Sequence, residues 1–208
     1  TNAVDVAVRQ AAIEALGRIA PEGLTRTLLV NSGAEANENA LRLAFRKTGR
    51  ERIVAVQGAF HGRTAAASAC TWNSGRWYAF PRTPFEVTFV PFDDVEALVA
   101  AVTDDVAAVI VEPVQGVAGA RAMSDTFLRA ARQRCDAVGA LLIADEVQSG
   151  TGRCGLPFAI TGAGVRPDLL TVGKGLAGGF PAAALLTTED AAEGTSVGDH
   201  GTTFGGGP

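Results

Sequence analysis

The segment Leu141-Leu142-Ile143-Ala144-Asp145-Glu146-Val147-Gln148 decides the fold of this chain. Four apolar residues run without interruption into two carboxyl groups, and such a run is typical of a strand that is covered on both faces. Ligands of open α/β sheets bind beyond the carboxyl ends of the strands. We therefore expect a buried strand that delivers Asp145 into a site with little water.

Similar apolar runs alternate with helical patterns along the whole chain. We expect strands at 28–31, 53–57, 87–91, 106–112, 140–145, 169–172 and 183–187. Apolar residues three and four positions apart predict helices at 3–19, 35–48, 94–102 and 125–138. Residues 71–85 contain two Trp and two Pro and have no clean period, so they should form a long surface excursion. The alternation predicts an α/β fold in three layers (α/β/α), with a mostly parallel central sheet and helices on both faces.

Composition limits the class of protein. With 208 residues, 47% of them hydrophobic and 19% charged, the chain can bury a sizeable core. The net charge of -4 and the lack of a basic stripe argue against nucleic acid as a partner. No apolar run approaches the roughly 20 residues that span a bilayer, and no signal peptide is recognisable. We expect a cytoplasmic protein without a membrane partner.

The cysteines and the chain ends carry two further expectations. Cys70, Cys135 and Cys154 are odd in number and widely spaced, which favours free thiols. Two histidines are too few for most zinc sites, so no metal is expected. The chain begins without Met and ends in Gly205-Gly206-Gly207-Pro208, so we expect residues 1–208 to be one domain of a longer polypeptide.

Polar groups follow four of the expected strands at their carboxyl ends, and they should meet at one edge of the sheet. These groups are residues 31–34, Glu112, 145–148 and Lys174. Glycines flank Lys174 and allow a close backbone approach that a surface lysine does not need. Taken alone, Asp145 could cap a helix or pair with a cation, and Lys174 could be a solvated cation.

Together these residues favour a site for pyridoxal phosphate. The aldehyde of this cofactor needs a lysine for a Schiff base and its ring nitrogen needs an acidic partner, which suits Lys174 and Asp145. The cofactor's phosphate needs N–H donors, which Ser32-Gly33-Ala34 would offer at the start of a helix. The same segment, with Glu35 at the third helical position, also matches a capping box, and both interpretations can hold together.

Several motifs in order resemble the class III aminotransferases, a subgroup of the fold-type I pyridoxal-phosphate enzymes that includes acetylornithine, ornithine and 4-aminobutyrate aminotransferases. The motifs are Asn31-Ser32-Gly33-Ala34-Glu35-Ala36-Asn37, Phe60-His61-Gly62-Arg63-Thr64, Val111-Glu112-Pro113-Val114-Gln115-Gly116, Asp145-Glu146-Val147-Gln148, Gly173-Lys174-Gly175 and Thr202-Thr203-Phe204-Gly205-Gly206. The second motif looks most like the acetylornithine branch. The resemblance implies that residues 1–208 are the large, cofactor-binding domain, and that an N-terminal segment and a small C-terminal domain are missing.

The resemblance also implies a role for each matching residue. Lys174 would form the Schiff base and then move the proton between the substrate carbon and the cofactor carbon, while Asp145 would pair with the ring nitrogen. The other expected contacts are Gln148 at the ring hydroxyl, Val147 beneath the ring, Phe60 stacked above it, Ser32, Gly33 and Ala34 at the phosphate, His61 and Glu112 in support of the cofactor, Arg63 and Thr202 at the substrate, and Thr203 at the phosphate of the neighbouring subunit. Arg63 could equally be a surface residue. The implied enzyme is a homodimer with shared active sites that moves a terminal (ω) amino group from an acetylornithine-like donor to 2-oxoglutarate.

Two positions depart from the family pattern. Val117 follows the third motif, where acetylornithine and ornithine enzymes commonly carry a glutamate that can pair with the arginine for the substrate's carboxylate. Its absence leaves the donor open, so ornithine, 4-aminobutyrate, lysine or another diamino acid remain alternatives. Gly207 stands where Asn is usual, which affects only the local turn.

Other classes fit the residues less well. A P-loop ATPase needs G-x-x-x-x-G-K-[ST], but Asp168 replaces its first glycine and Gly175 follows the lysine. A nicotinamide dehydrogenase needs G-x-G-x-x-G after the first strand, where Gly33 stands alone. A cysteine hydrolase would need a Cys–His pair that nothing in the sequence proposes. An inactive, truncated cofactor-binding fragment stays an alternative, although the presence of Lys174 and Asp145 argues against loss of activity.

Overall fold

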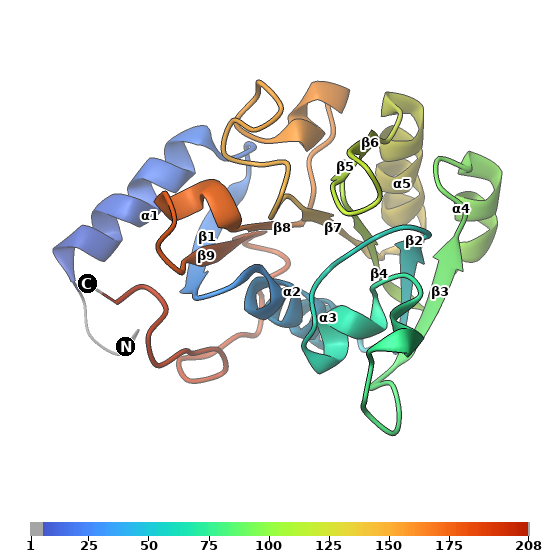
Figure 1. Cartoon of the computed structure of the whole chain (residues 1–208), viewed down its shortest axis with the longest axis horizontal. Coiled ribbons are helices and arrows are strands. Elements are labelled where there is room, and N and C mark those ends of the chain that lie inside the picture. Colours follow the sequence, from blue (N-terminus) through green and yellow to red (C-terminus); the bar gives the residue numbers. More distant parts are fainter. Residues whose placement is uncertain (1–5, 208) are drawn as a thin grey trace.

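A seven-stranded sheet forms the centre of the molecule in the computed structural model, which describes residues 6–207 (Figure 1). Across the sheet the strands follow the order β1 (Leu24–Val30), β9 (Ala183–Thr188), β8 (Leu169–Val172), β7 (Leu141–Asp145), β4 (Val106–Val111), β2 (Arg52–Val56) and β3 (Glu86–Val90). Strand β9 runs antiparallel to both of its neighbours, β1 and β8, and the other neighbouring pairs are parallel. The predicted α/β fold with a mostly parallel sheet is confirmed.

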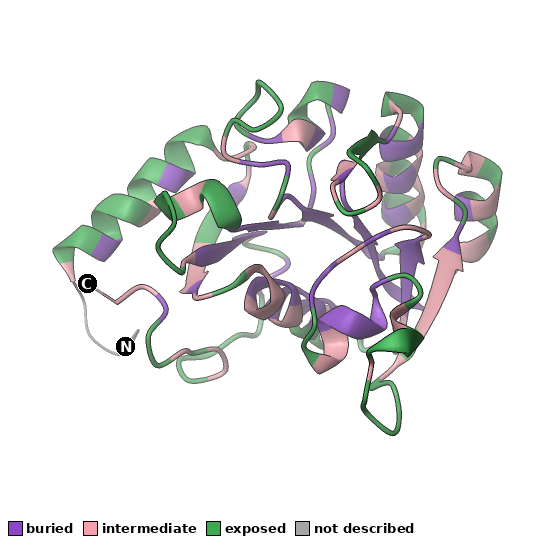
Figure 2. Ribbon diagram, viewed as in Figure 1, coloured by how far each residue is buried: buried purple, intermediate pink, exposed green. Residues whose placement is uncertain are grey.

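Helices cover both faces of the sheet. Helix α2 (Gly33–Thr48) packs on one face beside the short α3 (Ala65–Ala69), and α1 (Ala7–Ile19), α4 (Val95–Ala101) and α5 (Asp125–Val138) lie on the other (Figure 1). Alternate residues of β7 divide between two cores. Leu142 and Ala144 pack in one core with Phe127 of α5, whereas Leu141 and Ile143 pack in the other with α2. The central strands are accordingly buried between the helical layers (Figure 2).

Local signals set the ends of the helices. Ser32, Asp94 and Ser124 are the N-caps of α2, α4 and α5, and the side chain of each accepts a hydrogen bond from the amide three residues on. Helices α2 and α5 end at Gly49 and Gly139, whose positive φ angles of 67° and 70° favour glycine. Helix α2 thus begins two residues before its predicted start, directly after the turn that follows β1.

The structure differs from the prediction at one edge strand and in the short elements. Strand β1 begins at Leu24 rather than at residue 28, because polar residues at the sheet edge fill its first half and only its second half is an apolar run. The helix predicted at 3–19 begins at Ala7, and residues 3–5 lie outside the described residues. The elements without a prediction are α3, the hairpin of β5 (Val114–Gln115) and β6 (Arg121–Ala122), and the 3-10 turns η1 (Ser74–Arg76), η2 (Ala159–Ala163) and η3 (Lys174–Ala177). These elements are too short to show a period in the sequence.

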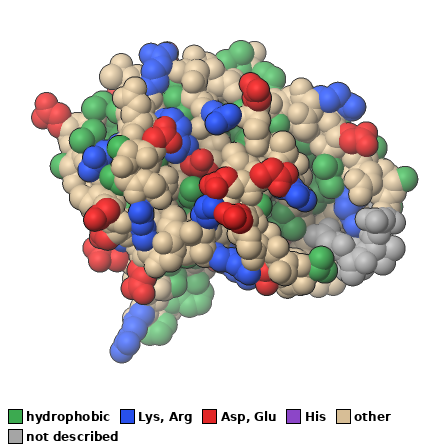
Figure 3. All heavy atoms as spheres, turned by 180° about the vertical axis from the view of Figure 1, so that it is seen from behind, with side chains coloured by type: hydrophobic (Ala, Val, Ile, Leu, Met, Phe, Trp, Pro, Cys, Tyr) green, Lys and Arg blue, Asp and Glu red, His purple; other side chains and the backbone are tan. Residues whose placement is uncertain are grey.

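The surface carries charges of both signs. On the face shown in Figure 3, Lys and Arg side chains are interspersed with Asp and Glu side chains. Ion pairs such as Arg46 with Asp199 at 2.6 Å and Arg52 with Asp105 at 2.7 Å join some of the opposite charges. None of the helices within residues 6–207 is long and apolar enough to cross a membrane. The three cysteines are free thiols, as predicted.

Candidate active site

A cavity of about 260 Å³ lies at the carboxyl edge of the sheet. The segments that enclose it are the start of α2, the loop after β2, the residue after β4, the end of β7 with the turn that follows it, and the first residue of η3. Among the described residues it is lined by Gly33, Ala34, Asn37, Phe60, His61, Gly62, Arg63, Glu112, Asp145, Val147, Gln148 and Lys174. The four segments that were predicted to converge at the sheet edge therefore do so.

Four hydrogen-bond donors surround Asp145 in the wall of this cavity. Its Oδ2 atom accepts from Asn37 Nδ2 and His61 Nδ1, each at 2.7 Å. Its Oδ1 atom accepts from the Val147 amide at 3.0 Å and, more weakly, from the Thr171 hydroxyl at 3.4 Å. The residue is only 3% exposed, and a buried carboxylate is costly unless such donors satisfy it. No helix begins at Asp145 in the described chain, so the alternative of a helix cap does not apply.

The imidazole of His61 has a defined arrangement. Nδ1 lies 2.7 Å from Asp145 Oδ2, and because a carboxylate only accepts hydrogen bonds, Nδ1 is the donor of this pair. Nε2 is buried and has no hydrogen-bond partner among the described residues. His61 therefore directs a ring N–H to Asp145.

Lys174 opens the turn η3 in an unusual backbone conformation. Its φ of 44° lies in the left-handed region, which costs about 1–2 kcal/mol for a residue with a side chain. Such strain persists mainly at functional sites, where the surroundings hold the residue in place. A Cβ on the preceding Gly173 would lie 3.3 Å from that of Ala183, so the glycine permits a close approach as predicted. The Nζ atom of Lys174 donates to Gln148 Oε1 at 2.8 Å.

The start of α2 forms another wall of the cavity. The amides of Gly33 and Ala34 belong to the first turn of the helix, where no acceptor within the helix is available, so they suit an anion. A Cβ on Gly33 would lie 2.5 Å from Val147 Cγ1, which only the absence of a side chain avoids. Glycine is therefore required here because α2 approaches the turn after β7 closely.

Ser32 stabilises the helix and does not line the cavity. Its Oγ accepts from the Glu35 amide at 3.2 Å, and Glu35 Oε2 accepts from the Asn31 amide at 2.9 Å. The predicted capping box is thus present with its second bond moved by one residue. A direct contact between Ser32 and a cofactor stays a prediction.

Glu112 is buried beside the other acidic group of the site. It is 3% exposed, and its Oε1 accepts from the Phe60 amide at 2.7 Å. Burial raises the pKa of Glu112 to about 7, with a further rise from Asp145 and an opposing effect from His61. Near neutral pH this carboxyl group is therefore partly protonated.

Aromatic and cationic side chains lie at the exposed side of the cavity. The guanidinium of Arg63 is 5.7 Å from the ring centroid of Trp77, and the Trp77 ring is 6.4 Å from the ring of Phe60. Arg63 is exposed, and Trp77 belongs to the surface excursion predicted at 71–85. The excursion therefore contacts two residues that line the cavity.

Thr202 and Thr203 do not line the cavity within the described part of the chain. Thr202 Oγ1 accepts from Asn31 Nδ2 at 2.8 Å, which ties it to the turn before α2, and Thr203 is exposed. Their expected roles stay predictions. Conversely, Asn37 lines the cavity although sequence reasoning assigned it no role. The available signal was a polar residue on the buried face of α2, next to Ala36, Ala40 and Leu41.

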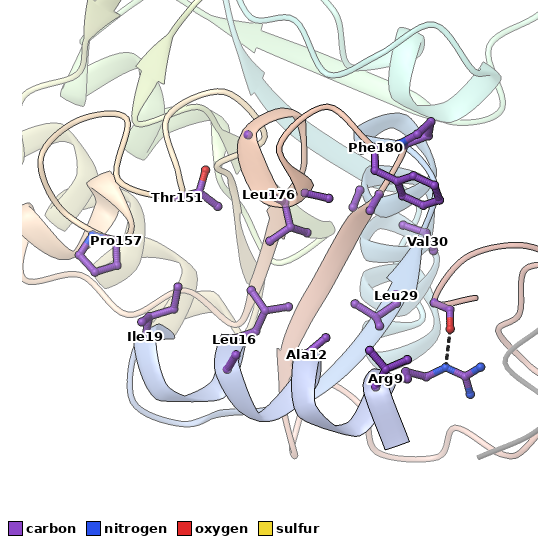
Figure 4. A pocket seen from close by; sticks show the side chains of 18 of the residues that line it. Arg9, Ala12, Leu16, Ile19, Leu29, Val30, Thr151, Pro157, Leu176 and Phe180 are labelled. Carbon is purple, nitrogen blue, oxygen red and sulfur yellow. Dashed lines mark hydrogen bonds between the residues drawn. The ribbon is translucent and has the colours of Figure 1, made fainter. Parts of the chain in front are cut away.

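A larger cavity of about 840 Å³ has a different character (Figure 4). It is lined by α1, β1, η3 and residues 151–157, and side chains such as Leu16, Leu29, Leu176 and Phe180 make it apolar. Arg9 is the one titratable residue among its described lining, and its Nε donates to the Gly206 carbonyl at 2.7 Å. Without a set of reacting groups, this cavity is not the candidate active site.

In its fold the chain is an α/β domain, and its smaller cavity gathers polar groups at the carboxyl edge of the sheet. It belongs to the aminotransferase class-III family, whose model matches residues 1–208. Acetylornithine aminotransferase of Methanopyrus kandleri is 47% identical over 193 residues, which are 93% of this chain and 50% of the relative. The acetylornithine aminotransferase of Streptomyces clavuligerus is 49% identical over 183 residues, covering 88% of this chain and 46% of the relative.

A solved structure has the same fold. Ornithine aminotransferase from Toxoplasma gondii superposes with a TM-score of 0.90 at 33% sequence identity, over 99% of this chain and 50% of that one. The chain spans about half the length of the curated relatives that it matches.

Proposed function

We propose that the chain is the cofactor-binding domain of a pyridoxal-phosphate-dependent aminotransferase. The enzyme would move a terminal amino group from an N-acetylornithine-like donor to 2-oxoglutarate. The observation that carries this proposal is that Lys174 and Asp145 line one cavity together with the start of α2. Membership of the class III family and similarity to acetylornithine aminotransferases support the type of reaction.

The residues of the cavity fit pyridoxal phosphate. The amides of Gly33 and Ala34 at the positive end of α2 suit its phosphate. Asp145 offers a buried carboxylate to a protonated ring nitrogen, and Phe60 offers an aromatic face to a flat ring. Lys174 is the one lysine among the described lining residues. These donors and acceptors match the cofactor's phosphate, ring nitrogen and aldehyde.

The residues of this chain would divide the work as follows. Bound at Lys174, the cofactor supplies an electron sink for breaking the C–H bond next to the substrate nitrogen. The amine of Lys174 would take up and return a proton at Nζ. Gln148, 2.8 Å from Nζ, orients that amine. Asp145, held in place by its hydrogen-bond donors, would accept a hydrogen bond from the protonated ring nitrogen.

Arg63 is the candidate for binding a substrate carboxylate. It combines exposure with a place in the cavity lining, and stacking on Trp77 limits where its guanidinium can lie. An N-acetylated donor presents a carboxylate and no second ammonium group, which suits a site with a free cation. Val117 is 65% exposed and lacks the carboxylate common at this position, so another class III donor such as ornithine or 4-aminobutyrate is the second candidate.

The active enzyme would be a homodimer with shared sites. Several exposed apolar side chains line the larger cavity, among them Phe180 (Figure 4). The others include Val8, Leu156 and Phe204. Exposed apolar side chains gathered in one place are typical of an interface. Thr203 precedes Phe204 in the chain and is itself exposed, which leaves it accessible to a second copy seated there.

Reduction with borohydride tests the proposal. The full-length enzyme should be yellow, and the reagent should fix the cofactor to Lys174. Lys47, the only other lysine of the chain, is the internal control. The ammonium of Lys47 donates to Asp190 at 2.8 Å and to Glu193 at 2.7 Å. These hydrogen bonds, chiefly the one to Asp190, raise the pKa of Lys47. Lys47 should therefore stay unlabelled. Replacing Lys174 with Ala should abolish labelling and transamination and preserve the fold. A label on Lys47, or no bound cofactor, would contradict the proposal.

A further inference from the structure

Asn37 is a buried polar residue whose three hydrogen-bonding groups are all used. It is 1% exposed and lies in the first half of α2. Its Nδ2 atom donates to Asp145 Oδ2 and to the His61 carbonyl, each at 2.7 Å. Its Oδ1 atom accepts from Thr171 Oγ1 of β8 at 2.8 Å. The side chain therefore links α2 to β7, to β8 and to the loop after β2.

These partners allow only one orientation of the amide. If the amide were reversed, Oδ1 would face the carboxylate of Asp145 and the carbonyl of His61, which are both acceptors. Thr171 is fully buried and its hydroxyl donates to Oδ1, so it reinforces the observed orientation. An N–H donor is thus directed permanently at Asp145 Oδ2.

We propose that Asn37 is a positioning residue, which holds the Asp145 carboxylate in place for the ring nitrogen of the cofactor. The inference rests on the proposed function. A donor that binds a carboxylate favours its charged form. An amide has no proton to transfer, so Asn37 stabilises the charge without being able to neutralise it. In this it differs from His61, the other side chain that donates to Oδ2.

The decisive experiment compares the full-length wild type with Asn37→Leu, which removes the donor and preserves the approximate size of the side chain. The two proteins are loaded with pyridoxal phosphate labelled with 15N at the ring nitrogen. In the variant, the nitrogen resonance should move toward that of an unprotonated pyridine. Affinity for the cofactor should fall by about 10- to 100-fold, as expected for a lost hydrogen bond to a charged group. The kcat should fall while the KM for the amino donor changes by less than about twofold, because Asn37 acts through Asp145.

A second ligand separates positioning from a general structural role. The 1-deaza analogue of pyridoxal phosphate has carbon in place of the ring nitrogen, so its affinity should be equal in wild type and Asn37→Leu. Asn39→Leu is the matched control on the same helix. Asn39 bonds to the Glu35 carbonyl at 2.8 Å and to His200 at 2.7 Å, so its loss should leave cofactor affinity and the nitrogen resonance unchanged.

Thr171 provides variants that test the network if Asn37→Leu does not fold. Thr171→Val has nearly the same shape and removes the hydroxyl, which donates to Asn37 Oδ1 at 2.8 Å and also lies 3.4 Å from Asp145 Oδ1. It should shift affinity and resonance in the same direction as Asn37→Leu by a smaller factor. Thr171→Ser retains the hydroxyl and should behave as the wild type.

Three outcomes would overturn the inference. The first is a folded Asn37→Leu or Thr171→Val variant with wild-type affinity and an unchanged resonance. The second is an equal loss of affinity for pyridoxal phosphate and for the deaza analogue. The third is a wild type that binds no pyridoxal phosphate, which would also refute the proposed function; the first two would leave that function intact.

Discussion

Replacing Glu112 with Gln should make the stability of the protein less sensitive to pH. The folded protein holds the pKa of Glu112 at about 7, well above its ordinary value of 4.5, mainly because the group is buried. Between these two values the folded protein keeps a proton that the unfolded chain has released. The free energy of unfolding therefore falls as pH rises through this window. The contribution of Glu112 is complete below pH 4.5 and is lost above pH 7.

The size of the effect follows from the shift in pKa. Each pKa unit corresponds to 1.36 kcal/mol, so a shift from 4.5 to about 7 is worth about 3.4 kcal/mol in full, of which about 2.5 kcal/mol is lost between pH 5 and pH 8. Glutamine does not titrate, and its Oε1 can still accept from the Phe60 amide. The variant should therefore gain about 2.5 kcal/mol relative to the wild type over this range of pH.

Urea unfolding of the cofactor-free, full-length proteins at pH 5, 6, 7 and 8 measures this difference. Glu96→Gln, at an exposed position of α4, is the control for the substitution itself. A difference in unfolding free energy between wild type and Glu112→Gln that is constant from pH 5 to pH 8 would refute the assignment of a raised pKa to Glu112.

Three further predictions concern activity. Asp145→Asn should reduce kcat at least 100-fold, because a neutral amide cannot hold the proton on the ring nitrogen. A factor of 100 corresponds to a loss of about 2.7 kcal/mol of transition-state stabilisation. Wild-type turnover in this variant would contradict the role of Asp145. Mixing Lys174→Ala with Thr203→Ala subunits should restore partial activity through heterodimers, and heterodimers without activity would assign Thr203 to its own subunit's site. The wild type should have a higher kcat/KM for N-acetylornithine than for ornithine, and Val117→Glu should change that ratio; a preference for ornithine would overturn the acetylornithine-like interpretation.

The main parts of the site could be predicted because each is a polar group at the end of an apolar strand. Asp145 directly follows Leu141–Ala144 in such a run, and Lys174 follows the run that became β8. Parallel strands place such ends at one edge of a sheet, so sequence position alone implied their proximity. The start of α2 was predictable for the same reason, with Ser32 as a cap.

The remaining features depend on contacts that no local pattern contains. Asn37 and Thr171 each interrupt an apolar pattern, yet the interruption does not reveal that they bond to each other across 134 positions of sequence. The raised pKa of Glu112 arises from burial beside Asp145 and His61, and neither the depth nor the neighbours can be derived from its own segment. The bond from the Glu35 amide to the Ser32 hydroxyl, in contrast, agrees with the capping box predicted from the sequence.

The position of β1 at the sheet edge has a consequence for how the protein is made. Its neighbour in the described sheet is β9, with Val30 beside Ala183, although the two strands lie near opposite ends of the chain. During synthesis, β1 emerges early from the ribosome and cannot pair until residues 183–188 have followed it. The start of α2, the proposed phosphate site, directly follows β1, so its final position depends on a strand that is translated about 150 residues later. Closing so long a loop costs conformational entropy before any native contact forms to offset it. A nascent chain that stops before β9 should therefore be unable to retain pyridoxal phosphate, so cofactor uptake should follow the translation of β9.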